Sequence, residues 1–135
     1  MCGIFGVLST NRFSEPDCIK SLQSLHHRGP DSARWWSYVY NEKKFLFLGH
    51  TRLSIQDLSD LGSQPMHSSD KRYTIIFNGE IYNFRELKRG LESSGVNFTG
   101  DSDTEVVLQL FIKYGLDCVE KLSGMFAFVV LDNIS

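Results

Sequence analysis

The sequence predicts a single α+β domain, and three observations lead to this fold class. Short segments of alternating or continuous apolar residues are typical of strands, and segments with apolar residues three or four positions apart are typical of helices. Their order is strand, helix, several strands, two helices and a final strand, which is the pattern of helices packed on sheets. The 135 residues suffice for one domain with a hydrophobic core, and no internal repeat or linker divides them.

The N-terminal part is expected to form a strand and then a helix that packs on the sheet. The strand covers residues 3–8, and the helix begins at Ser14, a common N-cap residue, with Pro16 in its first turn. Gly29 and Pro30 end the helix, because neither favours its continuation. The apolar face of this helix is formed by Ile19, Leu22 and Leu25.

A hairpin is expected next. Residues 33–40 and 45–49 have strand composition, and residues 41–43 form the turn between them. Residues 50–55 continue as an extended segment. Residues 57–66 are polar and interrupted by glycine and proline, which indicates a loop.

A buried strand and an amphipathic helix follow. The near-continuous apolar run at 73–77 predicts a strand that is covered on both faces. Asn78-Gly79 comes directly after it and is a common hairpin turn. A tight hairpin is nevertheless disfavoured here, because residues 84–93 have a helical pattern.

The C-terminal part is expected to contain a second long helix and a last strand. Ser102 and Glu105 have the spacing of a capping box, in which each side chain bonds the backbone amide of the other residue. Gly115 ends that helix, and a short helix follows at 118–122. Residues 124–132 are expected to form a fully buried strand.

The first residues carry the most distinctive chemistry. Removal of Met1, which the small side chain of Cys2 permits, would leave a thiol and a free α-amine on one carbon atom. An α-amine is partly neutral at about pH 7.5 and can take the proton of the thiol, as the attached base does in N-terminal threonine nucleophiles. Gly3 leaves space beside such a nucleophile. The alternative is an ordinary buried cysteine in a first strand.

Each of three further features, Arg52, the Asn78-Gly79 pair and Asp103, allows a structural and a functional interpretation. Arg52 is either a surface charge or a fork that grips a carboxylate with two hydrogen bonds. Asn78 and Gly79 either form a turn or supply two donors, a side-chain amide and a backbone N–H, to a developing oxyanion. Asp103 is either an acid favoured by the helix dipole or a partner for a substrate ammonium.

Composition argues against several other classes. The net charge of −2 and the isolated basic pairs disfavour nucleic-acid binding, and no apolar run approaches the roughly 18 residues of a membrane span. No secretory signal is expected, which favours the cytoplasm. His26 and His27 lack further ligands at useful spacing, so no metal site is expected. Three cysteines, at positions 2, 18 and 118, fit neither a disulfide framework nor a metal motif.

Seven segments, taken together and in this order, make the chain resemble the class II glutamine amidotransferase domains, whose nucleophile is an N-terminal cysteine. The resemblance covers residues 1–135 as one domain and is closest to glutamine-hydrolysing asparagine synthetases; segments 28–31 and 78–83 favour that branch over the sugar-phosphate and purine-pathway members. The segments are MCGIFG (1–6), HRGPD (27–31), GHTRLSI (49–55), QP (64–65), NGEIYN (78–83), SDTE (102–105) and GMFAF (124–128).

The resemblance implies a four-layer αββα sandwich of the N-terminal nucleophile hydrolase type, with Cys2 at the end of a central strand. It implies that Cys2 attacks the side-chain amide of L-glutamine to form a thioester, and that Asn78 and Gly79 form the oxyanion hole. Arg52 would bind the substrate α-carboxylate and Asp103 the α-ammonium. The other implied substrate-binding residues are Leu53, Ser54, Ile55, Gln56 and Glu80.

The resemblance also implies partners. Ammonia would pass to an acceptor on an ATP-dependent synthetase domain or subunit; ATP and Mg²⁺ are expected only there, and the glutaminase step itself uses no cofactor. A homodimer of the full-length protein is a further expectation. In the family this domain is longer and the synthetase domain follows it, so the chain is expected to be C-terminally incomplete, with sheet edges and apolar surface uncovered.

Three alternatives stay open at this point. The first is the amidotransferase domain of a related enzyme with another acceptor. The second is a non-catalytic, truncated remnant or interaction module. The third, which the sequence supports least, is a small metal- or nucleic-acid-binding domain.

Overall fold

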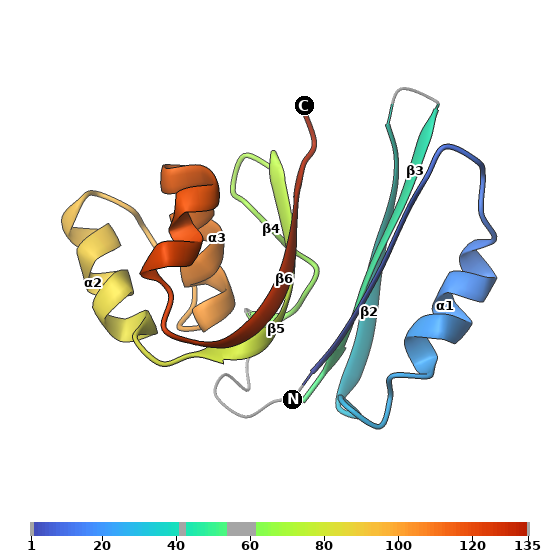
Figure 1. Ribbon diagram of the computed structural model, residues 1–135, viewed down its shortest axis with the longest axis horizontal. Helices are drawn as coiled ribbons and strands as arrows, with labels where there is room; N and C mark the ends of the chain where they lie inside the picture. The colour runs from blue at the N-terminus through green and yellow to red at the C-terminus, as the bar shows by residue number, and fades with distance from the viewer. Residues whose placement is uncertain (1, 41–42, 54–61, 135) are drawn as a thin grey trace.

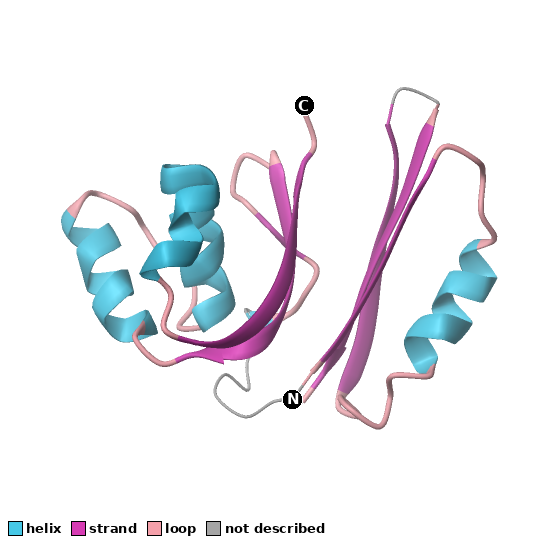
Figure 2. Ribbon diagram, in the orientation of Figure 1, coloured by secondary structure: helices cyan, strands magenta, loops and turns pink. Residues whose placement is uncertain are grey.

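The molecule has four layers. The structure is a computed structural model, and it describes residues 2–40, 43–53 and 62–134. Helices α2 and α3 form the first layer, two three-stranded sheets form the middle, and helix α1 covers the far side (Figures 1 and 2). This arrangement confirms the α+β fold class and the αββα order.

The first sheet is antiparallel and has β3 in the middle. β2 (Ser32–Tyr40) pairs with β3 (Lys44–Arg52) along its whole length, and β1 (Gly3–Ser9) pairs with residues 45–51 of β3 on the other side. The predicted strand at 45–49 is therefore longer, because residues 50 and 51 pair on both sides and Arg52 still pairs with Ser32 of β2.

The second sheet has β5 in the middle. β5 (Tyr73–Ile81) pairs with β6 (Gly124–Asp132) on one side and, over two residues only, with β4 (Met66–His67) on the other. Asn78 and Gly79 continue β5 instead of turning, because both pair with residues of β6. The strand predicted at 73–77 thus reaches four residues further.

Helix α1 (Glu15–Gln23) begins as predicted and packs on the outer face of the first sheet. Ser14 Oγ accepts the N–H of Asp17 at 3.4 Å. Leu22 is buried on β3, where a Cβ added to Gly49 would lie 2.8 Å from it. The glycine therefore lets the helix approach the sheet closely.

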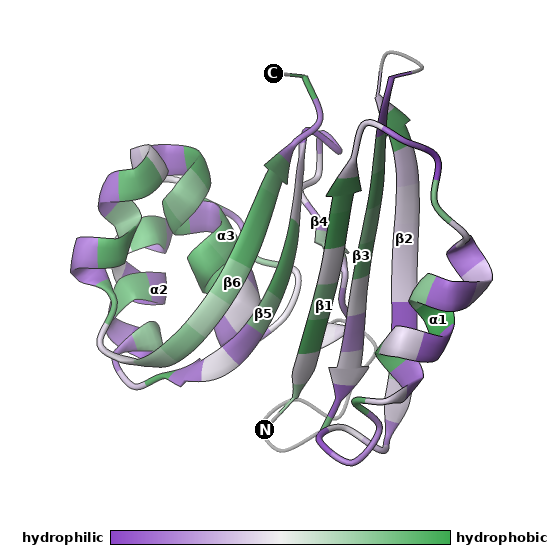
Figure 3. Ribbon diagram, turned by 45° about the vertical axis from the view of Figure 1, so that its right-hand side comes forward, coloured by the Kyte–Doolittle hydropathy of each residue, from purple (hydrophilic) through white to green (hydrophobic). Residues whose placement is uncertain are grey.

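The remaining helices cover the outer face of the second sheet. They are α2 (Phe84–Ser93), α3 (Asp103–Tyr114) and the 3₁₀ helix η2 (Gly115–Lys121). Phe77 of β5 is buried in one cluster with Val107 and Leu108 of α3. Between the sheets, Ile76 packs on Leu46 and Leu48, and Figure 3 shows how apolar residues concentrate on β1, β3 and β6.

Two local predictions are wrong. Ser102 does cap α3 by accepting the N–H of Glu105 at 3.3 Å, but the Glu105 carboxylate accepts the amides of Thr99 and Gly100, each at 2.8 Å, instead of returning to Ser102. The approaching loop competes for that carboxylate. β6 is not fully buried: exposed and half-buried residues alternate along it, because it is the outer strand of its sheet within the described residues.

Candidate active site

Cys2 lies at the N-terminal end of β1, beside the end of β3. Gly3 pairs with Thr51, which places Cys2 next to Arg52 and Leu53. The N–H of Leu53 donates to Cys2 Sγ at 3.4 Å, and Sγ lies 3.8 Å from the Leu53 carbonyl oxygen. The cysteine is unbridged and half-buried. The position at a strand end is confirmed, but β1 is the outer strand of its sheet within the described residues, not a central one.

Glycine is needed at position 3 for packing on the α1 side of the sheet, whereas the sequence analysis expected it to leave space beside Cys2. A Cβ at this position would lie 2.6 Å from Thr51 Oγ1 and 2.9 Å from Leu25 Cβ, on the side of α1. Successive side chains of a strand point to opposite faces. The glycine therefore lets the segment after α1 close on the sheet, and Cys2 faces the other way, toward the second sheet.

The loop at 26–31, for which the sequence suggested no role, holds the backbone on both sides of the thiol. Arg28 Nε donates to the carbonyl oxygen of Cys2 at 3.1 Å, and the N–H of Asp31 donates to the carbonyl oxygen of Arg52 at 3.0 Å. A Cβ at Gly29 would lie 2.4 Å from the carbonyl carbon and oxygen of Thr51. The HRGPD segment thus fixes Cys2 relative to Arg52.

Arg52 is the last residue of β3 and is half-buried next to Cys2. Arg28 and Arg52 are thus the two arginines beside Cys2 in the described part of the chain. Leu53 follows and contacts the thiol through its backbone, as described above. The implied substrate-binding positions Ser54, Ile55 and Gln56 lie outside the described residues.

Asn78 faces the first sheet from the end of β5. Ile76, two residues earlier on the same face, packs on Leu46 and Leu48 of β3, so the period of the strand turns Asn78 to the same side. Asn78 Oδ1 is buried and has no hydrogen-bond partner within the described part of the chain. A buried polar atom without a partner is costly, and such atoms are frequent where a ligand binds.

The backbone amide of Gly79 points to the edge of β5 that faces away from β6. The amides of Phe77 and Ile81, two residues before and after, bond outward to Gln64 Oε1 and Asp103 Oδ2 at 2.6 Å and 3.2 Å. Alternate amides of a strand share one side, so the Gly79 amide lies between these two bonds. A Cβ at Gly79 would come within 2.3 Å of the Met125 carbonyl oxygen, so only glycine fits.

Asp103 reaches β5 from the first turn of α3. Its Oδ2 accepts the N–H of Ile81 at 3.2 Å, which brings the carboxylate beside Glu80. Burial raises the pKa of Asp103, and the charge of Glu80 raises it further, whereas hydrogen bonds from the amides of Ile81 and Thr104 oppose the shift. Such a carboxylate gains from a cationic ligand.

His50 is a buried polar residue near the candidate site, and the sequence analysis gave it no role. It is 2% exposed, its Nε2 has no hydrogen-bond partner within the described residues, and it lies two residues before Arg52 on the same face of β3. Burial and the positive charge of Arg52 lower the pKa of His50 to about 4. A hydrogen bond with the backbone of Phe77 raises this pKa and offsets part of the shift. His50 is thus a neutral side chain on β3 that faces β5, the strand of Asn78.

The predicted site residues form two groups at one end of the sandwich. Cys2, Arg52 and Leu53 belong to the first sheet, whereas Asn78, Gly79, Glu80 and Asp103 gather on the second sheet. The start of β1 and the ends of β3 and β5 all lie at the bottom of Figure 1. A ligand there would meet a thiol, a cation, backbone donors and carboxylates.

In the part of the chain that the structure describes, no group of three or more His, Cys, Asp and Glu side chains could hold a metal ion. Among the helices that the structure describes, none has the length and apolar character to cross a membrane.

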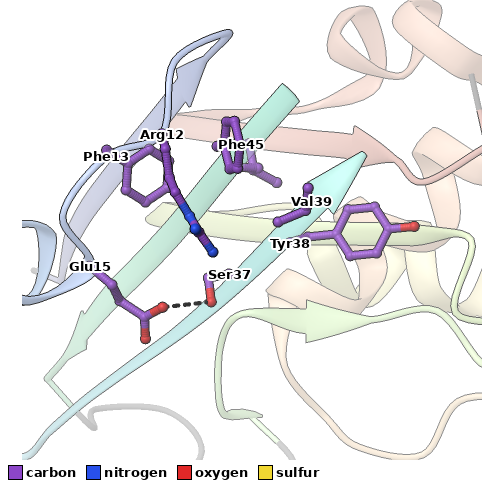
Figure 4. A pocket seen from close by; sticks show the side chains of 8 residues that line it. Arg12, Phe13, Glu15, Ser37, Tyr38, Val39 and Phe45 are labelled. Atoms are coloured by element: carbon purple, nitrogen blue, oxygen red, sulfur yellow. Dashed lines mark hydrogen bonds between the residues drawn. The ribbon is translucent and has the colours of Figure 1, made fainter. Parts of the chain in front are cut away.

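A cavity of about 400 Å³ lies at the opposite end of the first sheet. It is lined by Arg12, Phe13 and Phe45 among others, and Glu15 accepts the Ser37 hydroxyl at its rim at 3.1 Å (Figure 4). Phe45 pairs with Ser9, at the far end of β1 from Cys2. The cavity therefore has no part in the site described above.

Comparison with known proteins points to one family. The model of the glutamine amidotransferase domain matches residues 1–135. The chain is 42% identical over 135 residues to asparagine synthetase [glutamine-hydrolyzing] 1 of Bacillus subtilis, covering 96% of this chain and 20% of that protein. It is 40% identical to asparagine synthetase [glutamine-hydrolyzing] of Brassica oleracea, covering 98% of this chain and 22% of that protein.

The chain is also 38% identical to a putative asparagine synthetase [glutamine-hydrolyzing] 2 of Methanocaldococcus jannaschii, covering 98% of this chain and 28% of that protein. It thus spans between a fifth and somewhat over a quarter of these relatives. Among solved structures, glutamine phosphoribosylpyrophosphate amidotransferase from B. subtilis matches with a TM-score of 0.77 at 22% identity, over 96% of this chain and 35% of that one. This last likeness concerns the fold.

Proposed function

Because the chain belongs to the family of glutamine amidotransferase domains, we propose that it performs the glutaminase step of an asparagine synthetase. It hydrolyses L-glutamine to glutamate and ammonia through a thioester on Cys2. The observation that carries this proposal is the Cys2 thiol at the start of β1, held beside Arg52 in a chain that matches the family over residues 1–135.

The chemistry follows from a terminal cysteine. Once Met1 is removed, the α-amine of Cys2 takes the thiol proton and Sγ bonds to the side-chain carbonyl carbon of glutamine. The resulting oxyanion accepts hydrogen bonds from the Asn78 side-chain amide and the Gly79 N–H, and loss of one such donor typically costs roughly 10²–10³ in rate. The amine then protonates the leaving nitrogen and ammonia departs.

Hydrolysis completes the cycle. Water gives a proton to the α-amine and attacks the thioester carbonyl, and the carbon–sulfur bond breaks to release glutamate. The thiol regains its proton. No cofactor enters this sequence of steps.

Recognition of glutamine uses one partner for each charged end. Arg52 binds the α-carboxylate with its planar guanidinium, and Asp103 binds the α-ammonium. The raised pKa of the half-buried Asp103 supports this role, because a cation beside it would offset the cost of its charge. Glu80 and residues Leu53, Ser54, Ile55 and Gln56 complete the pocket.

Ammonia passes to an acceptor on an ATP-dependent synthetase domain or subunit, in the cytoplasm. ATP and Mg²⁺ belong to that part and not to the step catalysed here. The names of the relatives support asparagine synthesis, and each of them is much longer than this chain.

The test is glutamate release by the chain after removal of Met1. Incubation with L-glutamine should yield glutamate, and intact-mass spectra of quenched samples should contain a glutamyl adduct on Cys2. Cys2→Ala should lower the rate by at least about a thousandfold, because the nucleophile is lost. Cys118→Ala, which removes a buried thiol packed against α3, should leave activity in place.

A chain that releases no glutamate, or that works equally well with Cys2→Ala, contradicts the proposal. Absence of activity with normal folding would favour a non-catalytic module instead.

A further inference from the structure

The edge of β5 that faces away from β6 is held by side chains instead of a strand. β4 pairs with this edge only at Thr74 and Ile75. Further along, the Phe77 amide donates to Gln64 Oε1 at 2.6 Å and the Ile81 amide donates to Asp103 Oδ2 at 3.2 Å. The segment from Asn78 to Glu80 thus lies between two side-chain bridges.

Gln64 forms the first bridge with both ends of its amide. Besides accepting from Phe77, it donates through Nε2 to Thr104 Oγ1 at 3.1 Å. Gln64 is 6% exposed and Thr104 is 4% exposed. Buried polar contacts that are fully satisfied hold one geometry, because breaking them leaves unpaired buried groups, which is costly.

The two residues that Gln64 joins are the direct neighbours of site residues. Phe77 precedes Asn78 on β5, and Thr104 follows Asp103 on α3. The second bridge joins Asp103 to Ile81, and the apolar packing of Val107 and Leu108 on Phe77 also holds α3 on β5. Packing fixes the distance between the two elements less closely than hydrogen bonds do, so the two bridges on either side of Gly79 set the position of the first turn of α3 along β5.

We propose that Gln64 is a positioning residue that sets the separation between the oxyanion donors of β5 and the Asp103 carboxylate of α3. One glutamine molecule can then place its reacting carbonyl at the oxyanion donors and its α-ammonium at Asp103 at the same time. This inference rests on the proposed glutaminase function. Displacement of about 1 Å within a site can cost roughly a hundredfold in rate, so the separation matters.

The test compares L-glutamine with glutaramic acid, which is glutamine without its α-amino group. Glutaramic acid uses the same thiol and oxyanion donors but makes no contact with Asp103. Gln64→Met keeps the side-chain length and deletes both hydrogen bonds. It should lower kcat/KM for glutamine about ten- to a hundredfold and that for glutaramic acid much less, so the preference for glutamine shrinks.

Two further variants control the result. Gln109→Met makes the same substitution on α3 at a half-buried position away from the site, and it should leave the preference unchanged. Thr104→Val keeps the side-chain volume and removes only the acceptor of Gln64 Nε2. It should reduce the preference in the same direction, and it serves as the test if Gln64→Met does not fold.

Equal losses for both substrates, or an unchanged preference in both variants, would overturn the inference and leave Gln64 a purely structural role. That result leaves the proposed function standing, since the unchanged chain would still hydrolyse glutamine. If the unchanged chain is inactive, NMR titration measures the affinities of the same variants for L-glutamate and for glutarate, which lacks the α-amino group. A loss of the preference for L-glutamate in the variants then supports the inference, and binding of neither ligand contradicts both proposals.

Discussion

The surroundings of Asp103 disfavour the ionised form of its carboxylate. Burial and the neighbouring Glu80 both raise its pKa, and two backbone amides offset part of the shift. The same surroundings make the carboxylate a strong partner for a cation, because an ion pair gains more where water is excluded. The arrangement fits recognition of the α-ammonium of an amino acid.

Asp103→Asn should therefore weaken glutamine binding. The variant keeps an acceptor for the Ile81 amide but loses the charge-assisted contact, which is worth about 1.5–3 kcal/mol, or roughly ten- to a hundredfold in KM. The turnover number should change less, because the contact exists before and during the reaction. Steady-state kinetics with glutamine and with glutaramic acid measures this; KM for glutaramic acid should be unaffected.

The raised pKa of Asp103 also has a pH signature. The carboxylate must be ionised to bind the ammonium, so KM for glutamine should rise as the pH falls through the raised pKa, at a higher pH than for an ordinary aspartate. The Asp103→Asn variant should lack this rise. Identical pH profiles in the two proteins would refute the assignment.

At the scale of elements, the loop after α1 acts as a clamp on two strand ends. Arg28 holds Cys2, and the Asp31 amide holds Arg52. The loop lies so close to β3 that Gly29 has no room for a side chain. Its conformation therefore determines where the thiol and the guanidinium lie.

Gly29→Ala should disturb both stability and substrate binding. The added Cβ would meet backbone atoms of Thr51, at 2.4 Å, which cannot rotate away as a side chain could. We expect a loss of about 1–3 kcal/mol in the free energy of unfolding, measured in urea, and a higher KM for glutamine.

Gly90→Ala is the matched control. Gly90 lies inside α2 and an added Cβ there meets nothing within 4 Å, so the variant should gain about 0.5–1 kcal/mol through helix propensity. If Gly29→Ala were as stable and active as the unchanged chain, the loop could not be a clamp.

At the scale of the whole molecule, the contact between the two sheets changes character along its length. One end is apolar, where Ile76 packs on Leu46 and Leu48. The other end contains His50 and Asn78, each with a buried polar atom that has no partner within the described residues. The polar end is where the proposed site lies.

His50 should make the packing of the two sheets sensitive to acid. The pKa of His50 is lowered to about 4 in the folded chain and lies near 6.5 when unfolded, so the unfolded chain binds the proton first. The stability that comes from keeping His50 neutral is fully present above about pH 6.5 and is lost as the pH falls to about 4. The free energy of unfolding should fall by about 3 kcal/mol over this range. Urea unfolding at a series of pH values measures it.

His50→Gln is the comparison, because glutamine has no charge to gain in this range. The variant should lose less stability between pH 6.5 and pH 4 than the unchanged chain. Parallel losses in the two proteins would show that other groups cause the acid sensitivity.

Leu8, Met125 and Val129 are 69%, 62% and 42% exposed on β1 and β6, which are the outer strands of their sheets within the described ranges. Apolar surface of this kind favours contact with other protein.

Much of the molecule could be predicted from local patterns. Strand and helix segments followed hydrophobic periodicity, the caps at Ser14 and Ser102 followed from residue type, and the motifs identified Cys2, Arg52, Asn78, Gly79 and Asp103 as candidate site residues. The roles of Arg28, His50 and Gln64 were missed, although each lies in a recognised motif. Their contacts join positions 13 to 40 residues apart or lie between sheets, and no local pattern encodes them.

The order of elements, the family and the chemical groups available at the site follow from the amino-acid sequence alone. Other features depend on how distant segments fold together. These are the extension of β5 through Asn78-Gly79, the bonds of Glu105 to the preceding loop, the alternating burial of β6 and the link from β5 to α3 through Gln64. The physical reason is that periodicity and caps depend on neighbours within one turn or strand. Competition for a buried hydrogen bond depends instead on which distant segment arrives beside it.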